Sequence, residues 1–284
     1  MYKICLITFL LFCQFANGQK TVAFKFVPQE NRIYSSENMY SIKSVVNVAR
    51  STELSAELYE QGIFSPVTIE GISAWKSSTE TKNRVNDSIA YIARYFDYSA
   101  SQTINGETSE VDNPHYDSYV YGFYDTQDFQ NIIKVDSIVN KKLSIQEKEA
   151  LKNQIRQQDI IYQKSPIKVG DFFEKSSTMT SAAIGIGAIE FNIKSKYKLN
   201  SINNGIAYFD ITVSLELSNS EDSIEISPTS SGHGKLEFDI ENQFTRRKIT
   251  CYHIVAKTTK DGLRFSTTIL TKSSELTSLI NNFK

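Results

Sequence analysis

The segment SSGHGK, residues 230–235, contains the side chains of the chain that are best suited to nucleophilic catalysis. It brings the hydroxyls of Ser230 and Ser231 close in sequence to the imidazole of His233. Catalysis of this kind needs the base within hydrogen-bonding reach of the hydroxyl, and a third group that orients the base. No Gly-x-Ser-x-Gly segment, which presents the nucleophile in many hydrolases, occurs in the sequence. A turn before the next strand explains the serines and glycines, so we predict no catalytic residue.

Metal and cofactor chemistry has an equally weak basis in the sequence. Cys251 and His253 would lie on one face of a strand, but a structural zinc site normally needs four protein ligands and nothing nearby completes the set. The segment GIGAIE, residues 185–190, imitates part of a dinucleotide fingerprint. A strand rather than a helix follows it, whereas the pyrophosphate of a dinucleotide binds at a helix N-terminus. We therefore predict neither a metal site nor a cofactor.

Aromatic side chains are concentrated in HYDSYVYGFYDTQDF, residues 115–129. Tyr119, Tyr121 and Phe123 would share one face of a strand, and the polar YDTQD segment would lie at the tip of a hairpin. A structural role is favoured, because tyrosine covers apolar neighbours while its hydroxyl stays in water. As candidate ligand-binding residues we retain Tyr119, Tyr121, Phe123 and His233. A sugar platform would need more tryptophan than the single Trp75, which falls in a poorly patterned insertion that follows residue 50.

The elements that would position these residues are strands, most clearly in the C-terminal half. In FNIKSKYKL, residues 191–199, apolar side chains alternate with polar ones, three of which are lysines. Residues 208–217 and 234–240 alternate in the same way, which is typical of half-buried antiparallel strands. Asn204-Gly205 lies between the first two segments and favours a tight hairpin turn.

Three segments of the N-terminal half resemble segments of the C-terminal half in the same order. Residues 26–39 resemble 167–179, and residues 87–101 resemble 204–218. Phe123 and Phe129 then match Phe238 and Phe244. We therefore predict a mainly β protein of two related antiparallel β-meander units, built as curved sheets or half-barrels. The units would span residues 19–140 and 166–284, and residues 141–165 would connect them.

One surface α-helix is predicted within this connector, near residues 144–160. Ser144 and Glu147 have the spacing of a capping box, and strong helix formers follow them. The apolar stripe is narrow and consists of Ala150, Leu151 and Ile155, so the helix would lie on a surface. Docking of a partner on this helix is the alternative, which the narrow stripe does not favour.

The first eighteen residues read as a secretory signal peptide. A lysine precedes a short apolar run, and Ala16-Asn17-Gly18 supplies a small-x-small cleavage site after Gly18. The run is shorter than the roughly 20 apolar residues that span a bilayer. Cys13 raises the question of a lipid anchor, but the bulky Phe12 stands where a small residue is expected. We therefore predict an exported protein, periplasmic or extracellular, with no transmembrane segment after signal removal.

The charge and cysteine content of the chain limit its possible partners and the possible sources of its stability. Removal of Lys3 leaves thirty basic against thirty-two acidic residues, so the mature chain offers no electrostatic footprint for nucleic acid or an anionic membrane. Cys251 is the only cysteine after residue 18 and cannot form an internal disulfide. Stability must come from apolar burial, for which the remaining length is ample.

The chain resembles an uncharacterised family of exported bacterial proteins, defined as a domain of unknown function. The resemblance covers most of the chain after the signal and includes a central Pro-x-x-Val-Gly-Asp step at Pro166, Val169, Gly170 and Asp171. It implies an exported, mainly β protein and supplies no catalytic residues.

These patterns favour a non-catalytic binding protein over an enzyme. A curved sheet with a covering helix would form a trough for an apolar ligand, so a carrier or sensor of lipid-like molecules in the cell envelope is the first hypothesis. An envelope module that binds another protein is the alternative, and a hydrolase is the second alternative. The sequence leaves the ligand, the partner and the oligomeric state open.

Overall fold

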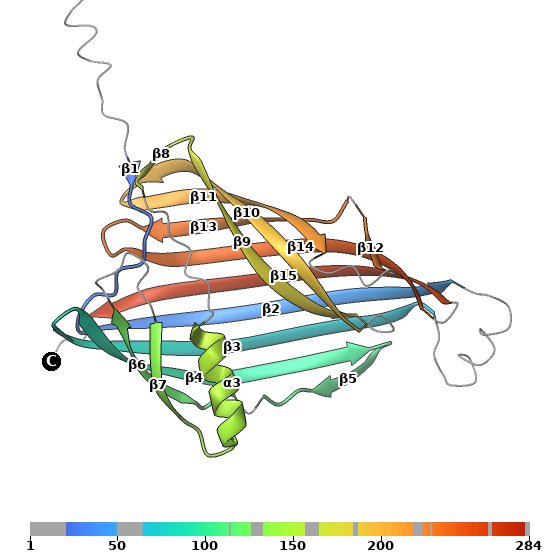
Figure 1. The fold of residues 1–284 in the computed structure, drawn as a ribbon, viewed down its shortest axis with the longest axis horizontal. Coiled ribbons are helices and arrows are strands. Elements are labelled where there is room, and N and C mark those ends of the chain that lie inside the picture. Colours follow the sequence, from blue (N-terminus) through green and yellow to red (C-terminus); the bar gives the residue numbers. More distant parts are fainter. Residues whose placement is uncertain are drawn as a thin grey trace, which may run out of the picture.

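A computed structural model describes residues 21–49, 65–113, 115–125, 133–156, 165–183, 187–217, 224–227, 229–260 and 263–281. Within these ranges the protein is mainly β, with one antiparallel sheet of 13 strands, a second sheet of two strands and one helix (Figure 1). This confirms the predicted fold class. No helix in the described ranges is long and apolar enough to span a membrane.

The elements divide at the helix into two sets. The N-terminal set contains β1 to β7, which are Thr21–Val22, Arg32–Ala49, Val67–Val85, Ser88–Ile104, Glu107–Glu110, Tyr119–Asp125 and Ile133–Val139. The helix α3 spans Ile145–Arg156. The C-terminal set contains β8 to β15, which are Ile167–Lys168, Phe172–Ala183, Gly187–Asn203, Ile206–Leu217, Ile224–Ile226, Ser231–Asp239, Phe244–Lys260 and Leu263–Asn281.

The two sets join into one continuous sheet. Its order is β7-β6-β4-β3-β2-β15-β14-β13-β11-β10-β9, with β5 and β12 as short additions to β4 and β14. Each half is a meander, and the first long strand of the chain pairs with the last one from Arg32↔Asn281 to Ala49↔Arg264. The two sets of strands therefore join through a full-length strand pair in the middle of the sheet.

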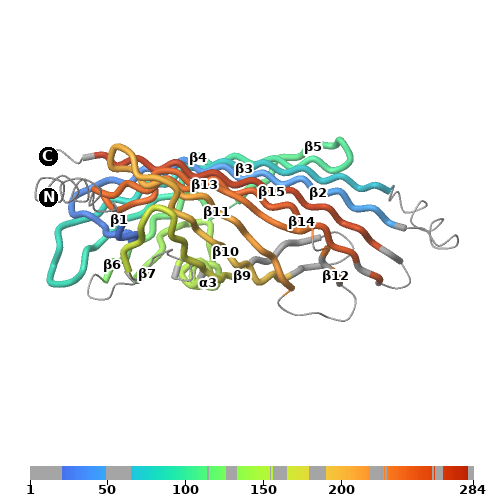
Figure 2. Tube along the Cα trace, turned by 90° about the horizontal axis from the view of Figure 1, so that it is seen from above, coloured from blue at the N-terminus to red at the C-terminus, as the bar shows by residue number. Residues whose placement is uncertain are grey.

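The sheet curls so that its two outer ends lie on the same side. In Figures 1 and 2, β6 and β7 bend round from one end and β9 and β10 from the other, with α3 between them. The inner face of the sheet is the face toward α3. Ile155 is buried there with Val135 and Ile138 of β7, and Leu151 packs against the same cluster. The curled sheet is thus concave toward α3, which lies at its open side, and we call this concave side the trough.

The C-terminal strands fold as their alternation predicts. Phe191, Ile193, Tyr197 and Leu199 of β10 are buried, while the lysines between them are exposed. The inner-face residues of β11 and β13 join them in one large core, which includes Phe209, Ile211, Leu236 and Phe238. Each strand places every second side chain on the inner face, so burial follows directly from the period of two.

The turns that the sequence predicts are also present. Asn204 and Gly205 both have positive φ, 47° and 75°, and connect β10 to β11. Asparagine and glycine tolerate this left-handed conformation, which a two-residue hairpin turn requires. In the N-terminal half, β6 and β7 pair antiparallel as the predicted hairpin, although its tip lies outside the described residues.

The N-terminal half corrects one expectation. Trp75 does not lie in an irregular insertion, because it belongs to β3, a strand of 19 residues. The inner face of β3 alternates Ser73, Trp75 and Ser77, so it lacks the apolar period by which the other strands were predicted. The sequence also allows a short helix that ends near Gly62, but this segment lies outside the described residues.

The predicted capping box of α3 is confirmed. The amide and the hydroxyl of Ser144 both donate to Glu147 Oε2 at 2.7 Å, and the amide of Glu147 donates to Ser144 Oγ at 3.3 Å. These bonds from Ser144 hold the pKa of the Glu147 carboxyl below its ordinary value. The cap fixes where the helix begins and so where its apolar side chains meet β7.

Strand registers agree with the proposed correspondence of the two halves. Ile89 at the start of β4 pairs with Tyr124 of β6, and Ile206 at the start of β11 pairs with Asp239 of β13. Each partner directly follows a matched phenylalanine, Phe123 or Phe238. An internal duplication stays a prediction that this agreement supports.

Candidate functional site

A strap of residues 23–31 crosses the trough between β1 and β2. Its anchor at one end is the pairing of β1 with β8. Phe24 is buried in the C-terminal core, with its ring centroid 4.8 Å from that of Phe238, 4.9 Å from Phe209 and 5.3 Å from Phe173. Phe26 lies two residues further on and packs instead against the smaller N-terminal core. The strap therefore contacts both cores and passes over the gap between them.

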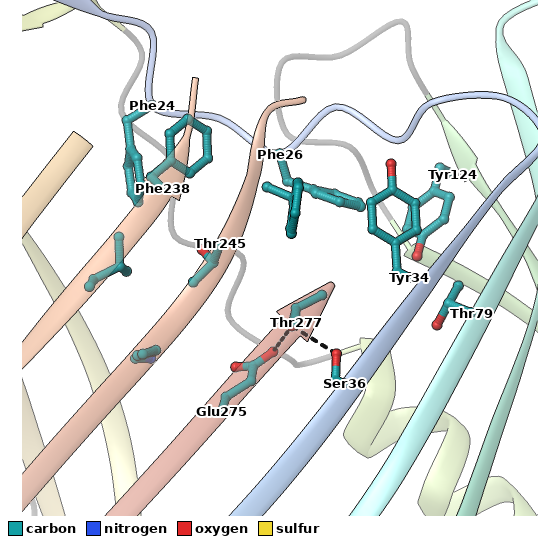
Figure 3. A pocket seen from close by; sticks show the side chains of 13 residues that line it. Phe24, Phe26, Tyr34, Ser36, Thr79, Tyr124, Phe238, Thr245, Glu275 and Thr277 are labelled. Atoms are coloured by element: carbon teal, nitrogen blue, oxygen red, sulfur yellow. Dashed lines mark hydrogen bonds between the residues drawn. The ribbon is translucent and has the colours of Figure 1, made fainter. Parts of the chain in front are cut away.

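This gap is a chamber of about 280 Å³. Figure 3 shows the strap above it and the side chains that line it. The wall near the strap is aromatic. The ring of Phe26 packs edge-on against Tyr34 and Tyr124, with ring centroids 5.6 Å and 5.7 Å apart. The ring of Tyr34 packs in the same way against Phe244, with the centroids 5.8 Å apart. Aromatic rings offer large apolar area with defined geometry. The wall therefore offers ring surface to an apolar group.

The opposite side of the chamber is polar. The hydroxyls of Ser36 and Thr277 are 2.8 Å apart across β2 and β15, and Thr277 Oγ1 donates to Glu275 Oε1 at 3.4 Å. Lys248 of β14 lies opposite Glu275 in the strand register. The chamber thus has an aromatic side and a side with hydroxyls and one pair of opposite charges, as in sites that bind molecules with two unlike ends.

Tyr34 fixes the strap over the chamber. Its hydroxyl accepts a hydrogen bond of 2.9 Å from the amide of Gln29, and the carbonyl of Gln29 accepts one of 2.6 Å from Thr81. Burial raises the pKa of the Tyr34 phenol, although the Gln29 bond opposes this shift. Tyr34 is therefore a neutral wall residue that also holds the end of the strap.

The sequence-predicted residues lie elsewhere in the fold. Tyr119, Tyr121 and Phe123 share one face of β6, as predicted, but it is the outer face, because the alternate residues Val120 and Tyr124 are buried in the N-terminal core. Arg94 covers the ring of Tyr119 at 5.5 Å, and Lys134 covers that of Phe123 at 5.1 Å. His233 lies on β13, and β4, β3, β2, β15 and β14 separate it from β6. The four residues are not brought together, and their role in ligand binding stays a prediction.

His233 lines a separate hollow of about 420 Å³ with Cys251, His253 and Leu270. His233 and Cys251 are directly paired in the strand register. Among the described residues, no group of three or more His, Cys, Asp or Glu side chains could hold a metal ion. This hollow therefore gives no basis for a metal site.

The sequence reasoning missed the residues of the chamber. A signal was present in the alternation along the strands. Lys248 lies on the same face of its strand as Thr250 and Tyr252, and Glu275 lies on the same face as Thr271 and Thr277. A charge in the buried phase of a strand is unusual unless it has a partner. The two residues become neighbours only through the pairing of β14 with β15.

Comparisons with known proteins give no assignment. No protein-family model matches the chain, and no curated protein matches it in sequence. The resemblance to a family of unknown function therefore stays a prediction.

Distant structural likenesses exist. A lipovitellin structure described for its lipid–protein interactions has a TM-score of 0.42 at 7% identity, over 90% of this chain and 26% of that one, so the chain spans about a quarter of its length. The translocator domain of the autotransporter NalP from Neisseria meningitidis has a TM-score of 0.32 at 6% identity, and the match covers 86% of this chain and 88% of that one. The TodX monoaromatic hydrocarbon channel, in a deletion mutant, has a TM-score of 0.25 at 8% identity, and the match covers 90% of this chain and 91% of that one. These likenesses are too distant to indicate what the chain does.

Proposed function

We propose that the protein is a non-catalytic binding protein that holds an apolar or lipid-like ligand in the chamber beneath the strap. The chamber itself carries the proposal. Protein interiors are normally packed as densely as organic crystals, and a void bordered by ring faces forfeits dispersion contacts. A volume of about 280 Å³ beneath the strap, between the two cores, is therefore better explained as a site than as a packing defect.

The rest of the proposal follows from the sequence. The N-terminal segment of residues 1–18 has the pattern of a signal peptide, so the ligand would be bound outside the cytoplasm. A carrier or a sensor in the cell envelope fits both the signal-peptide pattern and the aromatic wall of the chamber.

The direct test is mass spectrometry of organic extracts from residues 19–284, purified from the native host without detergent. We expect one apolar molecule per chain. A clean extract, repeated after incubation with host lipids, overturns the proposal.

A matched pair of variants then locates the ligand. Ser36→Phe places a ring in the chamber, whereas Ser35→Phe adds the same ring one residue earlier, on the outer face of β2. We expect only Ser36→Phe to lose the extracted molecule while circular dichroism shows both to be folded. Retention by both variants would place the ligand outside the chamber and refute the assignment of this site.

The alternative of a protein-binding module has one observation in its favour. Exposed apolar side chains lie on the outer face of the three central strands, namely Met39, Ile72, Leu270, Leu276 and Ile280. Contiguous exposed apolar surface often marks a protein interface. Analytical ultracentrifugation of the native chain and of Leu276→Lys tests self-association: a mass above the monomer that Leu276→Lys abolishes would support this alternative, and an unchanged monomer in both chains would count against self-association.

A further inference from the structure

Lys248 and Glu275 stand out on an otherwise uncharged stretch of the inner face. Along β2 from Tyr34 to Val48, the inner-face residues of β2, β3 and β15 are apolar, aromatic, hydroxyl-bearing or amide-bearing, except Glu275. Lys248 lies directly opposite it on β14. Both side chains are partly buried and both line the chamber.

Stability alone is a weak reason for this pair. Withdrawing two charges even partly from water carries a desolvation cost, and their attraction offsets this cost only with excellent geometry. Hydroxyl or apolar residues, which fill the neighbouring inner positions, would avoid the cost altogether. Two opposite charges that line the chamber are therefore informative about what enters it.

The same cross-strand row continues into aromatic residues. Glu275 pairs with Asn38 of β2, and Asn38 pairs with Trp75 of β3, so Lys248, Glu275, Asn38 and Trp75 form one row across four strands. Adjacent strands are about 4.8 Å apart, which places Trp75 roughly 10 Å from Glu275 along the sheet. Tyr116 lies beyond it, with its ring centroid 6.0 Å from that of Trp75 and 4.1 Å from that of Tyr98.

Tyr95 of β4 also faces this row. Burial raises the pKa of its phenol, and the nearby Glu275 carboxylate raises it further. The carboxylate thus faces a neutral phenol on the N-terminal side of the trough. An acidic group beside aromatic faces is the arrangement that favours a cationic ammonium, which is attracted both by the charge and by the rings.

We propose that this row binds the zwitterionic head group of a single-chain amphiphile, with the ammonium near Glu275, Trp75 and Tyr95 and the anionic group near Lys248. The inference rests on the proposed function, because the chain of the amphiphile would occupy the aromatic chamber. Opposite charges one strand apart match a molecule whose own opposite charges are separated by a short linker. The chamber of about 280 Å³ lies near the small end of ligand pockets, which suits one alkyl chain rather than two.

Trp75 makes the test direct, because it is the only tryptophan of the chain. Its fluorescence reports titration of residues 19–284 with n-dodecylphosphocholine and with uncharged n-dodecyl maltoside, each below its micellar concentration. We expect the zwitterion to bind about tenfold more tightly, which corresponds to the net contribution of roughly one charged contact. Equal affinity for the two probes overturns the head-group assignment.

Two further probes test whether the alkyl chain is needed and whether the anionic group must be a phosphate. Phosphocholine without a chain tests whether a free head group suffices, and dodecyl betaine replaces the phosphate by a carboxylate. We expect the first to bind at least tenfold more weakly than dodecylphosphocholine. Comparable affinity for free phosphocholine would overturn an amphiphile as the ligand. We expect dodecyl betaine to bind more tightly than dodecyl maltoside; a failure to do so would overturn a zwitterion site of the general form proposed.

Charge-neutralising variants assign the residues. Glu275→Gln and Lys248→Met should each weaken dodecylphosphocholine about tenfold and leave dodecyl maltoside unchanged. The matched controls are Glu70→Gln and Lys43→Met, which break a pair of 2.6 Å on the outer face of β3 and β2 and should change neither affinity. Equal losses in the inner and outer variants would show a nonspecific effect of charge and refute the site.

Failure of the two proposals can be told apart. If no dodecyl probe binds and Ser36→Phe changes nothing, the chamber is not a ligand site and both proposals fall. If dodecyl maltoside binds as tightly as the zwitterion and Glu275→Gln has no effect, the apolar chamber stands and only the head-group site is lost.

Discussion

The two halves of the sheet use the same meander but fill their inner faces differently. In the C-terminal half, phenylalanine and aliphatic side chains from β10, β11 and β13 form one continuous core. In the N-terminal half, a smaller core of tyrosine, valine and isoleucine depends on α3 to cover it. The chamber lies where the two meet. The C-terminal core therefore closes one side of the trough, and the smaller N-terminal core leaves space beside it.

Small side chains on two strands help to explain the hollow where the two cores meet. Serines and threonines on the inner faces of β2 and β3 are too small to reach across the trough, so the curvature of the sheet is not matched by side-chain volume there.

Breaking the larger core should have the greatest effect. Phe24→Ala removes a fully buried ring that contacts three other phenylalanines, so we expect a loss of about 3 to 5 kcal/mol in the free energy of unfolding. Urea denaturation followed by circular dichroism measures it. A loss below about 1 kcal/mol would show that the strap is not part of the core.

Truncation of a buried side chain of α3 should lower the free energy of unfolding by less. Ile155→Ala removes one buried side chain from the smaller core. We expect a loss of about 2 kcal/mol in the free energy of unfolding, because α3 lies at the open side of the sheet and can move to fill part of the space. Hydrogen exchange should then speed up in α3 and β7 but not in β10 and β11. Faster exchange in all four elements would mean that the two cores unfold as one unit.

The strap anchor is the next smaller contact. Tyr34→Phe keeps the ring in the chamber wall but removes the acceptor for the Gln29 amide, so we expect a loss of about 1 kcal/mol. Tyr208→Phe, at an exposed tyrosine of β11, should change the midpoint of urea denaturation little. Equal shifts in the two variants would contradict the anchoring role of Tyr34.

The helix cap gives the smallest effect and a pH dependence. Because the pKa of Glu147 is lowered in the folded state, its contribution to stability is present above the ordinary glutamate pKa and is lost as pH falls through the lowered value. We expect Glu147→Gln to flatten that acid limb of the stability profile slightly. An unchanged limb would show that the cap bonds do not differ between folded and unfolded states.

How far the sequence predicts the fold follows from what each inner face contains. Where it is apolar, as at Phe191 and Ile193, a period of two predicts both the strand and its buried face. Where it carries Ser73, Trp75 and Ser77, the same backbone geometry leaves no hydrophobic period, and β3 was missed. Local signals such as Asn204-Gly205 and the Ser144 cap needed no long-range information and were predicted correctly.

The site was beyond sequence reasoning for a different reason. Tyr119, Tyr121 and Phe123 attract attention because they are close in the sequence, whereas the chamber takes its residues from the strap and six strands. Glu275 and Asn38 are neighbours only because β15 pairs with β2. No local pattern encodes that pairing, so the charged row could be found only after the sheet order was known.

The pairing of β2 with β15 also dictates an order of folding. Neighbouring strands within each meander can zip together from their own turns, but β2 must wait for the last strand of the chain before its second edge is satisfied. Contacts of such long sequence separation form slowly, because a long loop must close before they stabilise the fold. Until then the edge of β2 remains a template for other chains. The central seam of the sheet is therefore the step at which this protein is most exposed to misassembly.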